Sequence, residues 1–289
     1  MLSPRLLTEH WPLTNVEFGQ LFQSYPTRQV VQITADQGLF VAKIDDHPLP
    51  FEHATQSLAV FDFLSARSFP HIPALLKTND GQSLLYTPER SVLVMEYLAG
   101  NRPIATAATW AELGRIACTL NAHQDYPYPY AIDTAGAIAE LTEQAQHHPD
   151  TERLQTFISW LTPLAQAPNA GLLHGEINLQ NVAQHSDGTL VLLDWDDAGS
   201  GPTVLEVGYP LIVVFLSEKL QLHHELARAY YRGYYAKGAP TDEEKELVFC
   251  AALFHALRYM RFANQQRRWE RICYAVAHKE ALLALLPSV

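Results

Sequence analysis

The sequence predicts an α+β fold in which an antiparallel sheet is followed by a mainly helical region. Two pairs of β-rich runs, separated by one helical pattern, occupy the first third of the chain, and the pattern turns helical after Gly100. The 289 residues are 48% hydrophobic and 18% charged, an ordinary globular composition. This length allows one large domain or two lobes, and with the change to helical sequence we expect a division into residues 1–98 and residues 99–289.

The first pair of strands is predicted at Val30–Thr34 and Leu39–Ile44. The intervening Asp36-Gln37-Gly38 is a hairpin signal, because its residues favour tight turns. From Phe51 to Ala66, apolar residues recur at intervals of three, which predicts a helix with one apolar face. The order of elements is thus strand, strand, helix.

A second pair of strands is predicted at Ser83–Thr87 and Val92–Tyr97. The latter run is almost wholly apolar, which is typical of a central strand. Three helices are then predicted at Thr109–His123, Ile132–Gln146 and Thr151–Ala165. The first third therefore supplies the sheet and the helices follow it.

The final predicted sheet element is a short hairpin that joins Asn181–Ala183 to Leu190–Leu193 through Asp187-Gly188. From Thr203 onward the sequence is helical again. A capping box that begins at Thr241 precedes an apolar helical stretch. A hairpin is thus inserted among the predicted helices.

Charge and hydropathy exclude several classes of function. A net charge of −11 without clustered Lys and Arg argues against a nucleic-acid partner. The longest apolar run, Tyr209–Leu216, is far short of a bilayer span, and Met1–Leu13 has no continuous apolar core of the signal-peptide kind. Three dispersed cysteines suggest no disulfide framework. We expect a cytoplasmic protein, either a monomer or a homodimer, without membrane contact.

Residues that carry chemistry gather in and after the loop that follows Leu173. Glu176 and Asn181 lie five positions apart, and the predicted hairpin then ends in Asp194-Trp195-Asp196-Asp197. A carboxylate that accepts a proton from a hydroxyl, together with oxygen ligands for Mg²⁺, is what phosphoryl transfer requires locally. The stretch therefore favours phosphoryl transfer.

This stretch resembles the aminoglycoside phosphotransferase and choline kinase-like family of small-molecule kinases, which includes homoserine kinase-like enzymes and is related to protein kinases. The family's loop reads H-G-D-x-x-x-x-N and is followed by a strand and a D-W/F-D/E motif. The matching residues are His174, Gly175, Asn181, Asp194 and Trp195. The resemblance implies a two-lobed protein-kinase-like fold, with a five-stranded antiparallel nucleotide-binding lobe, a mainly helical catalytic lobe, and a cleft for ATP or GTP with Mg²⁺.

Family roles are implied for three residues of the matched stretch. Asn181 and Asp194 are expected to ligate Mg²⁺, and Glu176 stands where the family has the aspartate base. Glutamate is longer by one methylene, which displaces the charge by roughly 1 Å, and such a misplacement can cost about 10²-fold in rate. From the sequence alone, Glu176→Asp is therefore expected to raise turnover in an enzyme and to change nothing in a pseudokinase.

The resemblance also implies a nucleotide site in the first lobe. Lys43 is expected to hold the α- and β-phosphates, with Glu52 of the following helix as its partner, although helix spacing leaves Gln56 and Ser57 as alternatives. The residues Glu96 and Leu98 are expected to meet adenine through their backbone.

The expected function is transfer of a γ-phosphoryl group to a hydroxyl of a small molecule: an aminoglycoside, a choline-like alcohol, an amino alcohol or a sugar. The alternatives are a nucleotide-binding pseudokinase and a non-kinase α/β binding protein. His174 is expected to be structural, and His174-x-Glu176 lacks the P-C-x-x-C partner of zinc deaminases. The family builds its acceptor pocket from C-terminal helices, which makes the helix with His255, Arg258, Tyr259 and Arg261 a candidate there.

Overall fold

The structure is a computed structural model that describes residues 3–24, 27–46, 51–98, 102–167, 170–260 and 265–288, without the side chains of residues 23, 24, 52, 53, 56 and 57. The chain divides into two compact units, residues 1–102 with 183–195, and residues 103–182 with 196–289. The mixed α/β class, with an antiparallel N-terminal sheet and a helical C-terminal region, confirms the predicted class. The lobes at 1–98 and 99–289 stay a prediction.

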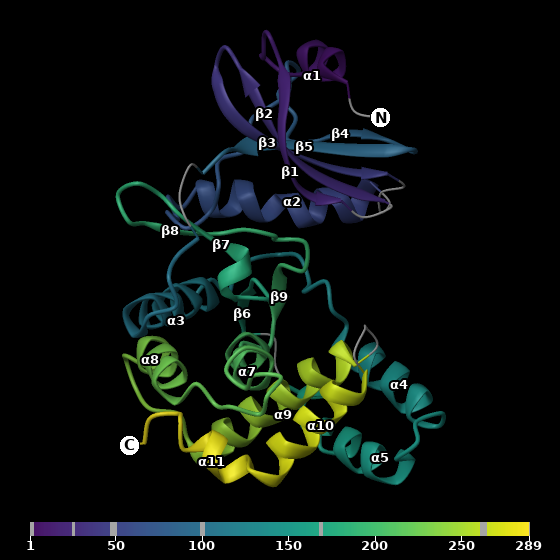
Figure 1. The fold of residues 1–289 in the computed structure, drawn as a ribbon, viewed down its shortest axis with the longest axis vertical. Helices are drawn as coiled ribbons and strands as arrows, with labels where there is room; N and C mark the ends of the chain where they lie inside the picture. The colour runs from purple at the N-terminus through teal and green to yellow at the C-terminus, as the bar shows by residue number, and fades with distance from the viewer. Residues whose placement is uncertain are drawn as a thin grey trace. The chain divides into compact units, whose positions relative to one another are not determined.

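An antiparallel five-stranded sheet forms most of the first unit (Figure 1). Its order is β1 (Glu17–Ser24), β2 (Arg28–Ala35), β3 (Gly38–Asp46), β5 (Arg90–Glu96) and β4 (Leu85–Thr87). The predicted hairpin is confirmed, because β2 and β3 pair in register from Arg28 with Asp45 to Ala35 with Gly38. Gly38 has a φ of 131°, a conformation that glycine adopts readily.

The core of this sheet depends on the alternation of side chains along each strand. Ala42 and Ile44 are buried with Ile33 and with Trp11, which follows helix α1 (Pro4–His10). Because neighbouring side chains of a strand point to opposite faces, Lys43 lies on the other face of β3. The sequence did not reveal α1 or β1, since α1 is short and β1 exposes its large apolar side chains.

Helix α2 (Phe51–Ser65) lies beside the sheet, as the helical pattern predicted (Figure 1). The hairpin of β7 (Val182–Gln184) and β8 (Leu190–Leu192), also predicted, brings residues 183–195 into the first unit. The ring of Phe61 in α2 meets that of Trp195 at 6.2 Å, and His71 accepts through its carbonyl from the Leu192 amide at 2.9 Å. These contacts place a distant segment of the chain beside α2 and the loop that follows it.

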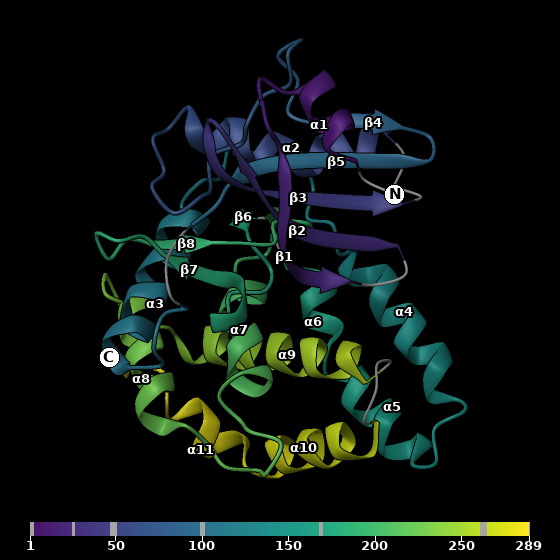
Figure 2. The ribbon, with the colours of Figure 1, turned by 45° about the horizontal axis from the view of Figure 1, so that its top comes forward.

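Helices make up most of the second unit. They are α3 (Ala107–Asn121), α4 (Thr134–Ala145), α5 (Thr151–Ser159), α6 (Thr162–Ala165), α7 (Val204–Val213), α8 (His224–Tyr234), α9 (Asp242–Tyr259), α10 (Gln265–Ala277) and α11 (Lys279–Leu283). Helix α3 packs against α8 and α7 against α9 (Figure 2). A Cβ on Gly114 of α3 would lie 2.1 Å from the Tyr230 carbonyl oxygen, so this close helix packing requires glycine.

One predicted helix is wrong in its extent. The expected Thr151–Ala165 helix is two helices, because α5 ends at Ser159 and α6 begins at Thr162. Pro163 stands in the first turn of α6, where its missing N–H costs nothing, whereas it would break the interior of a longer helix.

The predicted cap at Thr241 is confirmed, since its hydroxyl accepts from the Glu244 amide at 3.1 Å. Among the described residues, no helix has both the length and the hydrophobicity that a bilayer span needs.

Candidate active site

The first unit brings together two of the predicted site residues, Lys43 and Asp194. The Lys43 Nζ lies 3.4 Å from the Asp194 Oδ1, although the residues are 151 positions apart in the chain. The lysine side chain is 13% exposed and that of the aspartate 46%, so the carboxylate stays accessible to a metal. Asp194 follows β8 with a φ of 63°, an uncommon conformation that Asp tolerates better than most residues.

The predicted adenine-binding segment also lies in the first unit. The Glu96 carboxylate is occupied within the protein, because its Oε1 accepts from the Ala74 amide at 2.7 Å. Tyr97 donates its backbone N–H to Leu39 at 3.2 Å, and Leu98 follows it, half-buried. Adenine binding by the backbone of Glu96 and Leu98 stays a prediction. The side chain of Glu52 is outside the described part of the chain, so its pairing with Lys43 also stays a prediction.

Loop 174–181 of the second unit begins after β6 (Gly171–Leu173), which pairs with β9 (Gly199–Gly201). His174 is fully buried, and its Nδ1 accepts from the Glu176 amide at 3.3 Å, a structural role that agrees with the prediction. Gly175 has a φ of 94°, and a Cβ there would lie 2.5 Å from the Tyr130 hydroxyl. The loop therefore needs glycine both for its conformation and for space.

Two asparagines order the end of this loop. The Asn178 Oδ1 accepts from the Gln180 amide at 2.8 Å and the Asn181 amide at 3.3 Å, which caps the short 3₁₀ helix Leu179–Asn181. Asn181 donates its Nδ2 to the Glu176 carbonyl at 3.1 Å. Its amide oxygen is then the atom suited to ligate a metal, which fits the predicted role.

Glu206, in the first turn of α7, holds the start of the loop and was not predicted from the sequence. Its Oε2 accepts from the backbone N–H of His174 at 2.6 Å and of Gly175 at 3.0 Å. The side chain is fully buried, and its Oε1 has no hydrogen-bond partner among the described residues. The Glu206 pKa is raised to about 7, mainly by burial and in part by the nearby charge of Glu176, while the backbone N–H donors act in the opposite direction.

The raised pKa of Glu206 leads to a prediction on stability and pH. Because the folded-state pKa is about 7 and the ordinary value 4.5, the stabilisation is complete below about pH 4.5 and is lost as the pH rises through about 7. The Tm of wild type, measured relative to that of Glu206→Gln, should therefore fall between pH 5 and pH 8. A Tm difference that stays constant over this range would contradict the prediction.

Tyr259, the last residue of α9, donates its hydroxyl to Oε1 of the predicted base Glu176. The helix that was a candidate for the acceptor pocket therefore contacts loop 174–181 directly, through Tyr259. His255 has another role: it is buried, its Nε2 lies 3.0 Å from the Leu205 carbonyl oxygen, and burial lowers its pKa to about 3. The sequence singled out Tyr259 only by its place on a C-terminal helix, and only the fold shows its partner. Arg261, from the same prediction, lies outside the described residues.

The predicted residues thus form two described groups, Lys43 with Asp194 in the first unit and Glu176 with Asn181 in the second. That both groups meet at one metal stays a prediction. Within the described part of the chain, no three His, Cys, Asp or Glu side chains form a metal cluster. Mg²⁺ is commonly held by one or two protein ligands together with phosphates and water, so a cluster of three such side chains is not required for the predicted role of Asn181 or of Asp194.

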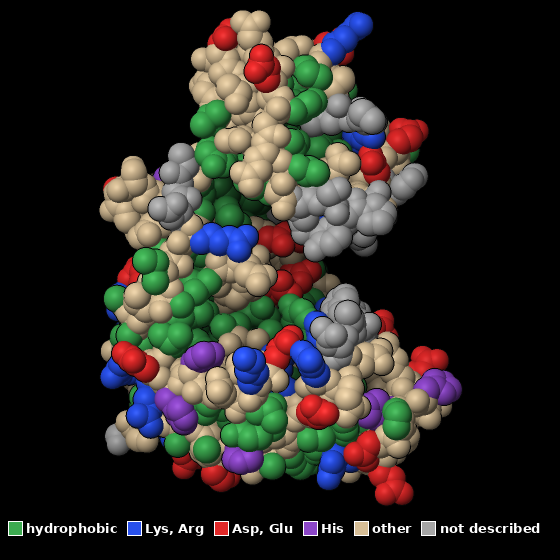
Figure 3. Space-filling model, in the orientation of Figure 1, with side chains coloured by type: hydrophobic (Ala, Val, Ile, Leu, Met, Phe, Trp, Pro, Cys, Tyr) green, Lys and Arg blue, Asp and Glu red, His purple; other side chains and the backbone are tan. Residues whose placement is uncertain are grey.

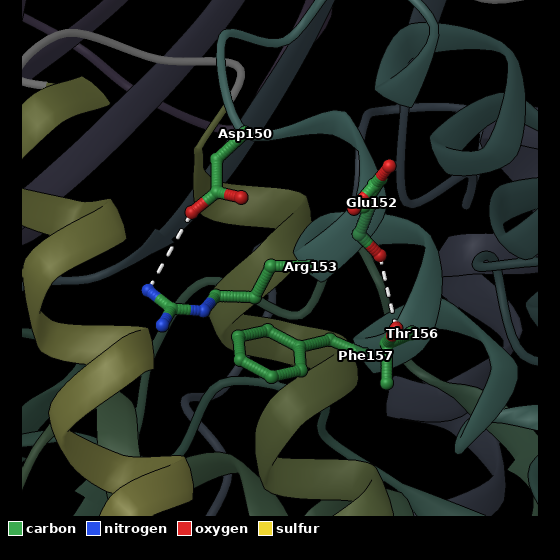
Figure 4. Close-up of a pocket in the computed structure, with 5 residues that line it drawn as sticks. All are labelled: Asp150, Glu152, Arg153, Thr156 and Phe157. Atoms are coloured by element: carbon green, nitrogen blue, oxygen red, sulfur yellow. Dashed lines mark hydrogen bonds and ion pairs between the residues drawn. The ribbon is translucent and has the colours of Figure 1, made fainter.

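Other surface features lie apart from these residues. The hollow in Figure 4 is lined by residues at the start of α5, where Arg153 forms an ion pair with Asp150 at 3.5 Å. None of the predicted site residues lines it. On the face shown in Figure 3, Lys and Arg side chains are interspersed with Asp and Glu and form no continuous basic surface among the described residues.

Comparison with known proteins decides the family. Residues 24–241, well over half of the chain, match the model of the phosphotransferase enzyme family. The chain belongs to this family. No curated protein matches it significantly by sequence.

Solved structures of phosphotransferases share the fold over nearly the whole chain. An amicoumacin kinase in complex with AMP-PNP, Ca²⁺ and Ami has a TM-score of 0.68 and 13% identity, over 98% of this chain and 94% of the kinase. A microcompartment-associated aminopropanol kinase has a TM-score of 0.66 and 16% identity, over 97% of this chain and 98% of that kinase. A spectinomycin phosphotransferase in complex with ADP and spectinomycin has a TM-score of 0.61 and 14% identity, over 97% of this chain and 95% of that enzyme. Family and neighbours together support a small-molecule phosphotransferase.

Proposed function

We propose that this protein transfers the γ-phosphoryl group of ATP or GTP, with Mg²⁺, to a hydroxyl of a small molecule. The observation that carries the proposal is the Lys43–Asp194 pair at 3.4 Å, which joins two distant segments of the chain. A cation for phosphates beside a carboxylate for the metal is the combination that phosphoryl transfer uses. Residues 1–98 would serve as the nucleotide-binding lobe and residues 99–289 as the catalytic and substrate-binding lobe.

The nucleotide and metal have distinct sets of residues in this proposal. Lys43 holds the α- and β-phosphates, and Asn181 and Asp194 hold Mg²⁺, which neutralises charge on the phosphates when bound. The amicoumacin kinase complex with AMP-PNP and Ca²⁺ and the spectinomycin phosphotransferase complex with ADP support the use of a nucleotide and a divalent metal. Adenine contacts from the backbone of Glu96 and Leu98 complete the nucleotide site.

Glu176 acts on the acceptor. Its backbone is held on both sides, because its N–H donates to His174 and its carbonyl accepts from Asn178 and Asn181. In the proposed step, the acceptor oxygen bonds to the γ-phosphorus, the bond to the leaving nucleoside diphosphate breaks, and the acceptor proton passes to the Glu176 carboxylate.

The net charge of the chain and the structural neighbours support one class of acceptor. A net charge of −11 mildly favours cationic molecules, and the neighbours include kinases of aminopropanol and spectinomycin. We propose hydroxylated amines, meaning amino alcohols, choline-like alcohols or aminoglycosides, ahead of neutral sugars. A cytoplasmic location agrees with the three free cysteines, Cys118, Cys250 and Cys273.

Nucleotide binding is tested by thermal unfolding. ATP or GTP with Mg²⁺ is expected to raise the Tm, because a ligand at 100 times its Kd stabilises the native state by about 2.7 kcal/mol. Mg²⁺ alone should have a much smaller effect, since the metal has only Asn181 and Asp194 as proposed protein ligands. An unchanged Tm with both nucleotides would contradict the proposed function and favour a non-kinase binding protein.

Turnover separates the enzyme from the alternative, a nucleotide-binding pseudokinase with a regulatory role, which Glu176 at the family's aspartate position motivates. The assay measures consumption of ATP or GTP across hydroxylated amines, antibiotics and sugars. Phosphoryl transfer to an acceptor supports the enzyme. Nucleotide-dependent stabilisation without transfer to any acceptor supports the pseudokinase.

A further inference from the structure

The proposed base, Glu176, is held at its carboxylate by a residue from a distant helix. Tyr259, 83 positions later in the chain, donates its hydroxyl to the Glu176 Oε1. Burial raises the pKa of Tyr259 well above its ordinary value, so the hydroxyl stays protonated and remains a donor. A charge-assisted bond of this kind is about twice as strong as one between neutral groups.

A second tyrosine links this contact to the loop that carries Glu176. The Asn178 Nδ2 donates to the Tyr209 hydroxyl at 3.0 Å, and the centroids of the Tyr209 and Tyr259 rings lie 6.4 Å apart. Because a carboxylate only accepts, the hydroxyl proton of Tyr259 points to Glu176. Tyr209 therefore contacts the loop through Asn178 and lies beside the ring of Tyr259.

Both tyrosines are anchored in packed structure. The Tyr209 ring is buried in α7 and meets the His255 ring edge-on at 5.3 Å. Arg268 of α10 donates to the backbone carbonyl of Tyr259, and its guanidinium lies 5.8 Å from the centre of the Tyr259 ring. The end of α9 is thus held from α7 and from α10.

We propose that Tyr259 is a positioning residue that holds the carboxylate of Glu176 in the orientation needed to act on the acceptor hydroxyl. This inference rests on the proposed function. The hydroxyl of Tyr259 fixes the terminal torsion of a glutamate, which is otherwise broad and freely sampled. It compensates for the extra methylene that distinguishes Glu176 from the aspartate of the family motif.

The inference reverses an expectation drawn from the sequence alone. An aspartate at position 176 is shorter by one methylene, roughly 1 Å of reach, and would withdraw from the Tyr259 hydroxyl. Glu176→Asp is then expected to lower turnover, whereas the family motif by itself predicts an increase. Tyr259 and Glu176 act as a matched pair.

The deciding experiment is a double-mutant cycle on kcat, with Tyr259→Phe measured in the Glu176 and in the Glu176→Asp background. In the Glu176 background we expect Tyr259→Phe to lower kcat by up to about 10²-fold with KM for the nucleotide unchanged. In the Glu176→Asp background it should change kcat by less than about 3-fold, because the shorter side chain has already lost the contact. Equal losses in both backgrounds, or no loss in either, would overturn the inference.

Tyr235→Phe is the matched control, because the Tyr235 hydroxyl also donates to a glutamate, Glu244, at 3.1 Å in the same unit. It removes the same kind of bond without touching loop 174–181 and should leave kcat unchanged. A loss of kcat as large as that of Tyr259→Phe would show that any lost tyrosine–glutamate bond has this effect, and would overturn the specific role of Tyr259.

A readout without turnover is the urea midpoint of Tyr259→Phe, Glu176→Ala and the double variant. We expect non-additive shifts, because either single change removes the same bond, and additive shifts would overturn the contact. A wild-type protein that transfers no phosphoryl group to any acceptor would contradict the proposed function, and this result is distinct from failure of the positioning role. An active wild type with an unchanged Tyr259→Phe variant contradicts the positioning role alone.

Discussion

Replacing Asp194 with alanine is expected to lower kcat by about 10³-fold, because the metal then loses its proposed carboxylate ligand and the charge of the transferred group goes uncompensated. Steady-state turnover over a range of Mg²⁺ concentrations measures this. The Lys43–Asp194 contact, in which the aspartate side chain is 46% exposed, is worth little to stability. The Tm without ligands should fall only modestly, through the strain of alanine at a φ of 63°, and retained cooperative unfolding separates a functional loss from loss of the fold.

Asp187→Ala is the control for this variant. Asp187 lies in the turn of the same hairpin, where its Oδ1 accepts from the Thr189 amide at 2.9 Å, and that backbone bond lowers the pKa of the carboxyl. Turnover near wild type is expected from it, because it has no proposed metal role. If Asp194→Ala kept wild-type turnover with an unaltered Mg²⁺ dependence, Asp194 would not be the metal ligand.

Glu176→Gln is expected to lower kcat by about 10²–10⁴-fold, the usual contribution of a general base. The amide preserves the shape of the side chain and can still accept the Tyr259 hydrogen bond through its oxygen. Stabilisation by ATP or GTP with Mg²⁺ should therefore persist in thermal unfolding. Loss of turnover together with retained nucleotide binding is the pattern that identifies the base.

Glu244→Gln provides the matched comparison, since Glu244 also accepts from a tyrosine hydroxyl but lies outside the proposed site. Its turnover should equal that of wild type. Should Glu176→Gln turn over as fast as Glu244→Gln, the proton of the acceptor would need another destination, and the role assigned to Glu176 would be wrong.

Local patterns predicted the sheet and most helices because they depend on neighbouring residues. The turn at Gly38 and the alternation along β3 identify a hairpin and place Lys43 on the face opposite the core. The break in the expected 151–165 helix was missed although Pro163 is visible in the sequence. A proline is acceptable in the first turn of a helix and disruptive in its interior, so it does not by itself show where a new helix begins. The residue at which α6 begins depends on how the helices pack.

The loop motif likewise indicated Glu176, Asn181 and Asp194 as candidates, because their spacing in sequence matches a known arrangement. It contained no sign of Glu206, whose carboxylate reaches the backbone of the loop from α7 some thirty positions later. A single glutamate at the start of a helix is ordinary, since acidic residues favour that end of a helix. Its burial, and hence its raised pKa, exists only in the folded chain.

The amino-acid sequence by itself determined the order of most strands and helices, the family, and the candidate residues that lie within one short stretch. Only the tertiary structure decided which distant side chains meet them: Asp194 beside Lys43, Glu206 on the loop backbone, and Tyr259 on Glu176. Periodicity and motif spacing report on residues a few positions apart. Contacts between residues separated by tens of positions depend on how whole elements pack, and no local pattern encodes them.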